Sequence, residues 1–414
     1  MARSGWVLVP GFVALFTIGA VAAETRPPKE TEADREALAL VEEVFRRIRA
    51  GFVDDVDASD LVEAAIGAML SSLDRHSAFL PPEDFDEMRI QAAGRFGGLG
   101  IEVGYEDGAV VVIAPMDDTP AAEAGLAAGD RIVRIDGAPV RDLTLGEAIR
   151  RMRGPVGEAV RIVVERGEAP PRDVEIVRDM IRVTPVRGRL EGDVAVLRIS
   201  TFNGDTTGDL EAEIVRLQEE AHAEGIELAG FVLDLRNNPG GLLTEAVGVS
   251  DILLDGGRIV ETRGRGGVVL DVSYARAGDR LNGAPLVVLV NRGSASASEI
   301  VAGALADHGR ALLIGETTFG KGSVQTVAPL GSDSAVRMTV ARYYSPSGRS
   351  IDGHGVEPHI VVRLTEDEAR EVALAGRRRA QDADADDDRP LSARDPKLSR
   401  AVEILRAGRL FVRV

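Results

Sequence analysis

The spacing of apolar residues divides the chain into a helical N-terminal part, a strand-rich block and a larger mixed part. Between residues 32 and 73, apolar side chains recur every three or four positions, which predicts two helices. From about Gly97 the pattern changes to short apolar runs and alternation, which predicts strands and one helix in a block the size of a compact module. The predicted strands are 97–103, 109–113, 131–135 and 160–164, and the predicted helix is 145–152.

The larger part, from about Gly192, alternates strands with helices. Its near-continuous apolar runs indicate strands that are buried on both faces, as in an at least partly parallel sheet. The strands are expected at 194–199, 231–235, 286–290, 311–314 and 335–344, and the helices at about 210–221 and 296–308. The predicted fold class is therefore α/β and multidomain. In such sheets ligands bind where a strand leads into a helix, so functional residues are expected at these turns.

Both ends of the chain have patterns of their own. Residues 1–23 carry a short positive region, an apolar run and small residues, which predicts a signal peptide cleaved near Ala23 rather than a retained membrane anchor. Residues 376–395 are rich in Asp and predict a solvated linker. Residues 396–414 have apolar positions at helical spacing, which predicts a helix that packs on its own domain or meets a partner.

The charge and the residue types present narrow the chemistry. There are 49 basic and 67 acidic residues, for a net charge of −18, and a chain this acidic is not expected to bind nucleic acid. The absence of cysteine excludes disulfides, thiolate nucleophiles and thiolate zinc sites. His354 and His359 are poorly spaced for metal ligands and are expected at the surface. We expect no metal and no other cofactor.

Two strand-to-helix turns contain the residue types of an acyl-transfer site. The first ends in Gly240 and Gly241, which can bring backbone N–H groups close to a developing oxyanion. The second places Ser296 at a helix N-terminus, where the helix dipole favours negative charge. Structural roles fit as well, because Ser296 and Glu299 match a helix-capping box and the glycine pair matches an ordinary loop. On these two motifs alone the structural interpretation is favoured.

A rare lysine changes this balance. Only three of the 49 basic residues are lysines, and two of them, Lys29 and Lys397, receive no role. Lys321 is flanked by glycines shortly after a predicted strand, and a desolvated Lys can act as a base, which Arg cannot. Ser296 and Lys321 are therefore candidates for a Ser–Lys dyad, which needs no histidine. Gln325, four residues further on, falls on the same side of the segment and is a candidate for orienting Lys321.

The strand-rich block resembles a PDZ domain over most of residues 91–168. The matching residues are Gly98, Leu99, Gly100 and Ile101 and the run from Thr119 to Asp130. The resemblance implies that the N–H groups of the glycine loop bind a free C-terminal carboxylate and that the following strand accepts an extended peptide. Taken alone, residues 97–100 also fit an ordinary turn at the start of a strand.

The chain as a whole resembles the C-terminal processing peptidases, also called tail-specific proteases. Besides the PDZ block and the three segments described above, the matching motifs are Leu73–Leu80, Tyr343–Ile351 and Gly355–Pro358, so the resemblance covers nearly the whole chain after residue 23. It implies a Ser/Lys protease core with a crotonase- or ClpP-like α/β fold and an inserted PDZ domain.

The resemblance also implies roles for particular residues. It assigns the nucleophile to Ser296, the general base to Lys321 and the orienting role to Gln325. It gives Arg153 a contact that couples tail binding to the catalytic domain, although a plain surface role for Arg153 stays open. The residues assigned to the oxyanion hole are Ala297 and either Gly240 or Gly241.

The expected organisation has six segments. They are a signal peptide (1–23), an N-terminal helical region (24–90), a PDZ domain (91–180), a Ser/Lys protease core (181–375), an acidic linker (376–395) and a C-terminal helix (396–414). The expected substrates are unstructured protein C-termini in the periplasm or another extracytoplasmic space. The resemblance also allows a recruiting lipoprotein or scaffold and a homo-oligomer. The alternatives are a non-catalytic periplasmic PDZ adaptor and a crotonase-like acyl-CoA enzyme.

Overall fold

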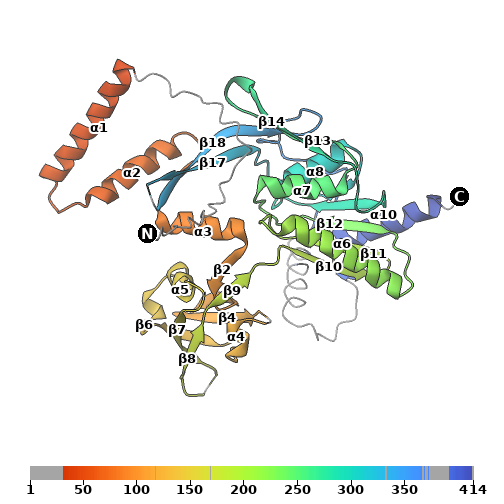
Figure 1. Ribbon diagram of the computed structural model, residues 1–414, viewed down its shortest axis with the longest axis horizontal. Helices are drawn as coiled ribbons and strands as arrows, with labels where there is room; N and C mark the ends of the chain where they lie inside the picture. The colour runs from red at the N-terminus through yellow and green to blue at the C-terminus, as the bar shows by residue number, and fades with distance from the viewer. Residues whose placement is uncertain are drawn as a thin grey trace, which may run out of the picture.

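A computed structural model describes residues 31–365, apart from Asp117, Glu168 and Ser332, and residues 391–412, together with the single residues Glu368 and Val372. The predicted signal peptide and most of the predicted acidic linker lie outside the described residues. The described part forms a helical N-terminal region, a small β-rich block and a larger α/β body (Figure 1).

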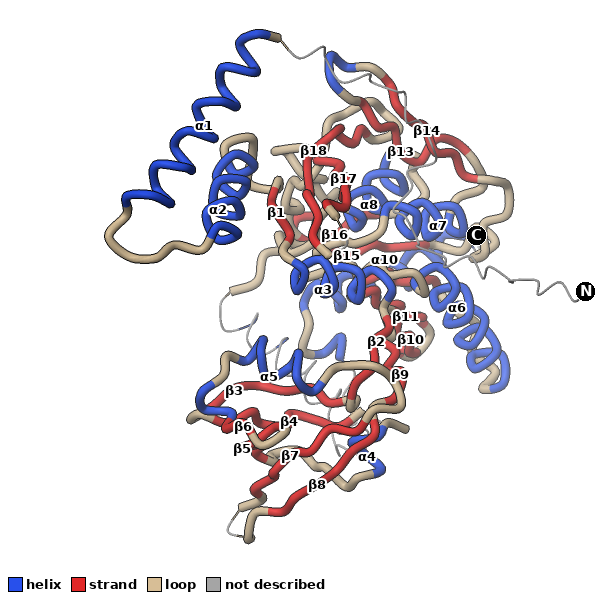
Figure 2. Tube along the Cα trace, turned by 60° about the vertical axis from the view of Figure 1, so that its left-hand side comes forward, coloured by secondary structure: helices blue, strands red, loops and turns tan. Residues whose placement is uncertain are grey.

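The N-terminal region contains three helices. They are α1 (Glu32–Gly51), α2 (Ala58–Ser71) and α3 (Pro82–Ala93). The first two are the helices predicted between residues 32 and 73. Helix α1 begins at Thr31, whose side chain and that of Asp34 form a capping box, but it buries none of its residues and projects from the body (Figures 1 and 2). Helix α3 lies between the β-rich block and the larger body (Figure 2).

The β-rich block is an antiparallel sheet with the strand order β3-β4-β5-β7-β8, and β3 is an edge strand. Its elements are β3 (Ile101–Glu106), β4 (Ala109–Pro115), α4 (Pro120–Glu123), β5 (Arg131–Ile135), β6 (Ala138–Pro139), η1 (Val140–Asp142), α5 (Leu145–Met152), β7 (Ala159–Glu165) and β8 (Arg172–Val177). The chain enters through β2 (Arg95–Gly98) and leaves through β9 (Asp179–Arg182), and these two strands pair with each other. Because entry and exit are adjacent, the block has the geometry of an insertion with a core of its own.

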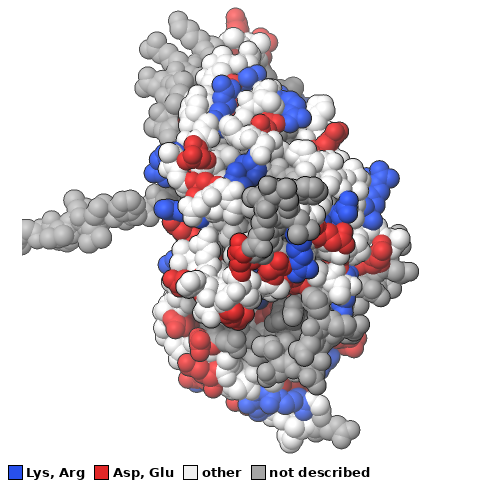
Figure 3. Space-filling model, turned by 90° about the vertical axis from the view of Figure 1, so that its right-hand side faces the viewer, with Lys and Arg blue, Asp and Glu red and all other residues white. Residues whose placement is uncertain are grey.

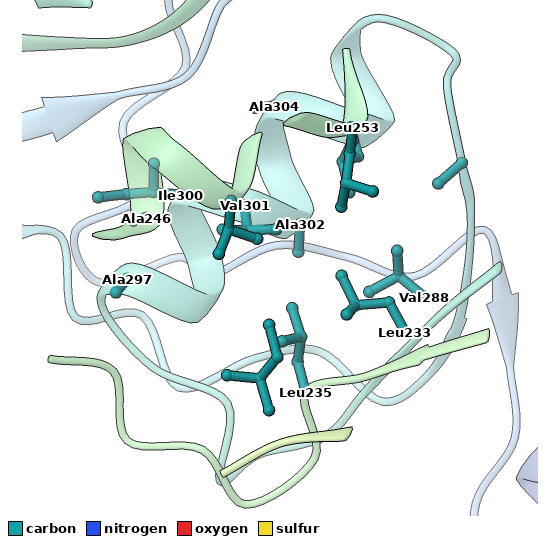
Figure 4. Packing of buried hydrophobic residues seen from close by; sticks show 14 of the residues in the cluster. Leu233, Leu235, Ala246, Leu253, Val288, Ala297, Ile300, Val301, Ala302 and Ala304 are labelled. Carbon is teal, nitrogen blue, oxygen red and sulfur yellow. The ribbon is translucent and has the colours of Figure 1, made fainter. Parts of the chain in front are cut away.

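The larger body is built on a six-stranded sheet that is parallel except for its first pair. The strand order is β10 (Val186–Glu191), β11 (Val194–Ile199), β12 (Gly230–Asp234), β15 (Leu286–Val290), β16 (Leu312–Gly315) and β19 (Ile360–Val361). Three helices cover one face, namely α6 (Thr206–Ala223), α7 (Leu243–Leu253) and α8 (Ala297–Asp307). The continuous apolar strands are therefore buried on that face against these helices. Figure 4 shows this packing for α7 and α8.

The opposite face of the sheet is covered by α10 (Pro396–Val412). Leu398, Ala401, Val402 and Leu405 of this helix pack against alternate residues of the central strands, such as Val232. Of the two placements predicted for the C-terminal helix, the structure therefore shows the one in which it packs on its own domain.

A second sheet extends the body. Its members are β1 (Ala78–Leu80), β13 (Gly257–Arg263), β14 (Val269–Ala275), β17 (Ser323–Leu330) and β18 (Ser334–Tyr344). Strand β1 belongs to the N-terminal region but pairs with β18, with Phe79 opposite Val336. The N-terminal region is thus joined by a β-ladder to the sheet that carries Gln325.

The described surface is mixed in charge. On the face drawn in Figure 3, Lys and Arg side chains stand singly or in small groups among Asp and Glu. Within residues 31–365 and 391–412, no helix combines the length and the apolar character that crossing a bilayer requires.

Candidate active site

The two predicted turns meet at the carboxyl ends of β12 and β15. The side chains of Asn237 and Asn291 join them, because Asn291 Nδ2 donates to Asn237 Oδ1 at 2.8 Å and the Asn237 N–H donates to Asn291 Oδ1 at 2.9 Å. The Ala295 N–H donates to the carbonyl of Asn238 at 3.0 Å. Side-chain and backbone hydrogen bonds therefore hold the glycine turn and the serine turn in one arrangement.

Three serines of the second turn have different surroundings. Ser294 and Ser298 are fully buried, and their hydroxyl groups donate to the carbonyls of Leu235 at 2.8 Å and Asn238 at 3.0 Å. Ser296 is partly exposed, and its hydroxyl group donates to no acceptor among the described residues, although the side chain closes a capping box with the Glu299 N–H. Of the three, Ser296 is thus the one whose hydroxyl group is available for chemistry.

The backbone of Ser296 has an uncommon conformation. Its φ of 56° and ψ of −113° lie outside the regions that side-chain-bearing residues favour, and it directly precedes the first residue of α8. Such strain persists only where neighbouring contacts enforce it, and it concentrates at functional sites. A strained turn that raises a serine at a helix N-terminus is a recurrent device for exposing a nucleophile.

Gly240 lies directly against this serine. A Cβ atom at Gly240, whose φ is 100°, would come within 2.8 Å of the Ser296 Cβ and 2.9 Å of the Ala297 nitrogen. Only glycine fits this approach, so the structure brings Gly240, Ser296 and Ala297 together. Gly241 follows directly and has a φ of 145°. A Cβ atom at Gly241 would lie 2.0 Å from the carbonyl oxygen of Phe202, so a side chain does not fit there.

The amides of the two glycines differ. The Gly240 N–H donates to the side-chain Oδ1 of Asn238 at 2.9 Å. In the part of the chain that the structure describes, the N–H groups of Gly241 and Ala297 have no acceptor. An oxyanion hole needs donors that are free before the reaction, so this geometry favours Gly241 over Gly240 as the partner of Ala297.

Glu299 joins the serine turn to the lysine loop, a role that the sequence did not reveal. Its fully buried carboxylate accepts from the N–H of Ser296 at 2.8 Å and from the N–H of Lys321 at 2.9 Å through Oε2. Through Oε1 it accepts from the Gly320 N–H at 2.7 Å and the Thr318 hydroxyl group at 2.5 Å. Burial raises the pKa of Glu299 and these hydrogen bonds oppose the rise. The predicted capping box is present and extends to the lysine loop.

Lys321 has the electrostatic surroundings of a base. Burial lowers the pKa of its ammonium group, the positive charges of Arg337 and Arg75 lower it further, and Glu299 acts in the opposite direction. Within the described residues, Lys321 Nζ makes no hydrogen bond, either to Ser296 or to Gln325. Gln325 Nε2 donates instead to Ser323 Oγ at 3.1 Å. The orienting role of Gln325 therefore stays a prediction.

The N-terminal motif at Leu73–Leu80 lies beside the lysine. The Arg75 guanidinium lies 5.3 Å from the ring centroid of Phe319, two residues before Lys321. The carbonyl of His76 accepts a hydrogen bond from Arg337 Nε at 3.0 Å. Burial and the charge of Lys321 lower the pKa of His76. The sequence showed this segment only as a family motif, because its contacts with the lysine loop come from the pairing of β1 with β18.

The glycine loop of the β-rich block is held from one side. The carbonyl of Leu99 accepts from the Ala121 N–H at 2.9 Å, and the carbonyl of Gly100 accepts from the Met116 N–H at 2.8 Å. Gly100 has a φ of 77°, and a Cβ atom there would lie 2.4 Å from the Thr119 side chain. The N–H groups of Leu99 and Gly100 have no acceptor among the described residues. Gly98 ends β2 and Ile101 begins the edge strand β3, so the loop opens directly onto that edge.

Arg153 contacts α3 rather than the catalytic turns. It follows the last residue of α5, and its guanidinium pairs with Glu87 of α3 and lies 4.3 Å from the ring centroid of Phe96. A second ion pair, Arg150 with Glu83 at 3.0 Å, joins the same two helices. Helix α3 in turn packs against β18.

Comparisons with known proteins identify the family of the chain. A model of peptidase family S41 matches residues 193–362, and a PDZ domain model matches residues 111–166. The chain is 49% identical over 326 residues to a carboxy-terminal-processing protease of Bartonella bacilliformis, which covers 78% of this chain and 75% of that protein. It is 37% identical over 338 residues to a carboxyl-terminal-processing protease of Picosynechococcus, covering 78% of this chain and 80% of that protein. The solved structure of a photosystem II D1 C-terminal processing protease is 33% identical, with a TM-score of 0.46, and the match covers 78% of this chain and 92% of that one.

Proposed function

The chain belongs to peptidase family S41, and we propose that it cleaves protein substrates with Ser296 as the nucleophile and Lys321 as the general base. The observation that carries the proposal is that one buried carboxylate, Glu299, accepts the backbone N–H groups of both residues. The Ser296 hydroxyl group, which donates to no described residue, and the lowered pKa of Lys321 support the assignment.

The reaction follows from these positions. Neutral Lys321 accepts the Ser296 proton as Oγ attacks the scissile carbonyl carbon, and the lysine then gives that proton to the leaving amine. The N–H groups of Gly241 and Ala297 stabilise the oxyanion, while Gly240 supplies the close backbone approach. Water, deprotonated by the same lysine, hydrolyses the acyl-enzyme and restores both groups. Gln325 fixes the direction of the lysine side chain once substrate is bound.

The PDZ domain selects the substrate. Its loop at residues 98–101 offers the unpaired N–H groups of Leu99 and Gly100 to a terminal carboxylate, and the edge strand β3 offers main-chain groups to the residues before it. Backbone recognition of this kind depends on a free C-terminus and only weakly on sequence. The substrates are therefore unstructured protein tails.

Arg153 couples tail binding to cleavage. Its ion pair with Glu87 joins the PDZ domain to α3, and α3 packs against β18. Strand β18 pairs with β17, the strand that contains Gln325. We further propose that the protein acts outside the cytoplasm, on the strength of the signal-peptide pattern in residues 1–23.

The test is cleavage of an unfolded reporter that ends in small apolar residues. The mature chain is compared with Ser296→Ala, and the same reporter with a C-terminal amide serves as the control. Cleavage that needs both Ser296 and the free carboxylate supports the proposal. Binding of the tail without cleavage by the wild type would favour the alternative, a PDZ adaptor.

A further inference from the structure

The amino end of α10 places two charged side chains near the carboxyl ends of the strands that lead into the active site. Asp395 immediately precedes the helix and Lys397 is its second residue. Both are buried, and Lys397 is only 2% exposed. No sequence pattern gave either residue a role, and buried Asp and Lys side chains are rare unless they are paired.

Asp395 binds Arg236. The arginine donates from Nη1 to Asp395 Oδ1 at 3.0 Å, and its Nη2 lies 2.7 Å from Oδ2. The same guanidinium binds Asp234, the last residue of β12, through two further hydrogen bonds of 2.9 and 2.7 Å. Burial alone would raise the pKa of Asp234, but the charge of Arg236 holds that pKa well below its usual range.

Lys397 binds Glu316. Its Nζ lies 2.5 Å from Glu316 Oε1, and the Glu316 N–H donates to the carbonyl of Val290 at 3.1 Å. Glu316 directly follows β16 and is five residues before Lys321. The lysine therefore binds the first residue of the loop that carries the proposed base.

The two partners of α10 begin two catalytic segments. Arg236 opens the turn that leads to Gly241, and Glu316 opens the loop that leads to Lys321. The apolar side chains of α10 already pack the helix on the sheet. Buried ion pairs add little net stability, because desolvation offsets their attraction. The two pairs join Arg236 and Glu316, the first residues of both segments, to the amino end of α10.

We propose that Asp395 and Lys397 are positioning residues of the active site, so that the C-terminal helix sets the geometry of the oxyanion turn and of the base loop. The proposal rests on the proposed function of Ser296, Gly241 and Lys321. If so, changes at the amino end of α10 lower the rate of catalysis and leave tail binding unchanged.

The experiment compares full-length Asp395→Asn and Lys397→Met with the wild type. Asn and Met keep the size of each side chain and remove its charge. The matched control is Arg406→Gln, which removes the exposed ion pair between Arg406 and Asp193 near the other end of the same helix. For each variant we would measure kcat and KM on the free-carboxylate reporter, the rate at which a fluorophosphonate probe labels Ser296, and the folded fraction by circular dichroism.

We expect kcat and the labelling rate to fall about tenfold or more in Asp395→Asn and Lys397→Met, because small displacements of reacting groups are costly. KM and the folded fraction at the assay temperature should stay unchanged, and Arg406→Gln should match the wild type. Where Lys397→Met lowers the melting temperature, the double variant Lys397→Met, Glu316→Gln removes the unpaired charge and should recover stability without recovering kcat.

Two results would overturn the inference. One is a kcat within twofold of the wild type in both single variants, and the other is a loss of kcat that only follows the loss of folded protein. A wild type that neither cleaves the reporter nor reacts with the probe would overturn the proposed function itself, and this inference with it.

Discussion

Ser296 and Lys321 donate their backbone N–H groups to one oxygen atom, Oε2 of Glu299, over 2.8 and 2.9 Å. The serine turn and the lysine loop are 25 residues apart in the sequence, and this shared acceptor fixes one against the other. The backbones of the proposed nucleophile and base are therefore held in place before a substrate arrives. Because these groups are already in position, no free energy of the reaction is needed to bring them there.

Glu299→Gln should lower both activity and stability. The amide offers one acceptor oxygen where the carboxylate offers two, and its NH₂ group would face N–H donors. We expect kcat to fall about a hundredfold and the free energy of unfolding to fall by about 2–4 kcal/mol. Reporter cleavage and urea denaturation measure the two effects. Glu403→Gln, at an exposed position of α10, is the control, and equal behaviour of the two variants would contradict the assigned role.

Lys321→Arg should abolish turnover although it keeps the positive charge. Arginine stays protonated in proteins and cannot accept the Ser296 proton. We expect kcat to fall about a thousandfold or more, with the affinity for tails unchanged. Single-turnover cleavage and peptide binding by fluorescence anisotropy check both parts. Activity near that of the wild type would exclude Lys321 as the base.

Arg337→Gln should move the pH dependence of cleavage. A lysine base is active when neutral, so activity rises with pH through the pKa of Lys321. The positive charge of Arg337 lowers that pKa, and removing it lets the pKa rise. The rising limb of kcat/KM against pH should therefore move to higher pH, with less activity at neutral pH and recovery in alkaline buffer.

The control for this shift is Arg337→Lys, which keeps the charge but changes the hydrogen bond to His76. Its pH profile should stay close to that of the wild type. An Arg337→Gln profile that stays in place, or that moves toward lower pH, would contradict the action of the Arg337 charge on the base.

Gly100→Ala should weaken tail binding. Its φ of 77° is unfavourable for alanine, and the new Cβ atom would lie 2.4 Å from Thr119, so the loop must change shape. We expect the Kd for a free-carboxylate peptide to rise about tenfold, whereas an amidated peptide binds weakly to both proteins. Gly67→Ala, where a Cβ atom meets nothing within 4 Å, is the matched control. An unchanged Kd for the free-carboxylate peptide in Gly100→Ala would show that the terminal carboxylate binds at another place.

Strong local patterns predicted most of the central sheet and strand β18 of the second sheet, but weak patterns left the other strands of the second sheet unpredicted. Strands β12 and β15 are continuous apolar runs, so their burial was visible in the sequence. Strands β13 and β17 were not predicted, because β13 ends in Glu261, Thr262 and Arg263 and β17 contains Pro329. These strands owe their conformation to pairing with β18, which lies far from β13 in the chain.

The site was predictable where a residue type was itself informative. A serine at a helix start, a glycine pair and a rare lysine led to Ser296, Gly240, Gly241 and Lys321. Other contacts join segments that only the fold brings together. These are the hydrogen bonds of Glu299 with the lysine loop and the ion pair of Lys397 with Glu316, 81 residues away. The preference for Gly241 over Gly240 depends on the rotamer of Asn238, which no sequence pattern specifies.

The burial of Lys397 has a practical consequence for chemical labelling. Amine-acylating reagents react with neutral amines, and in the described part of the chain the lysines are Lys321, which is partly exposed with a lowered pKa, and Lys397, which is buried against Glu316. Brief acylation followed by mass spectrometry of the peptide that carries Lys321 would therefore count the neutral fraction of that one side chain at each pH. The proposed base can thus be titrated directly, with no substrate and no turnover.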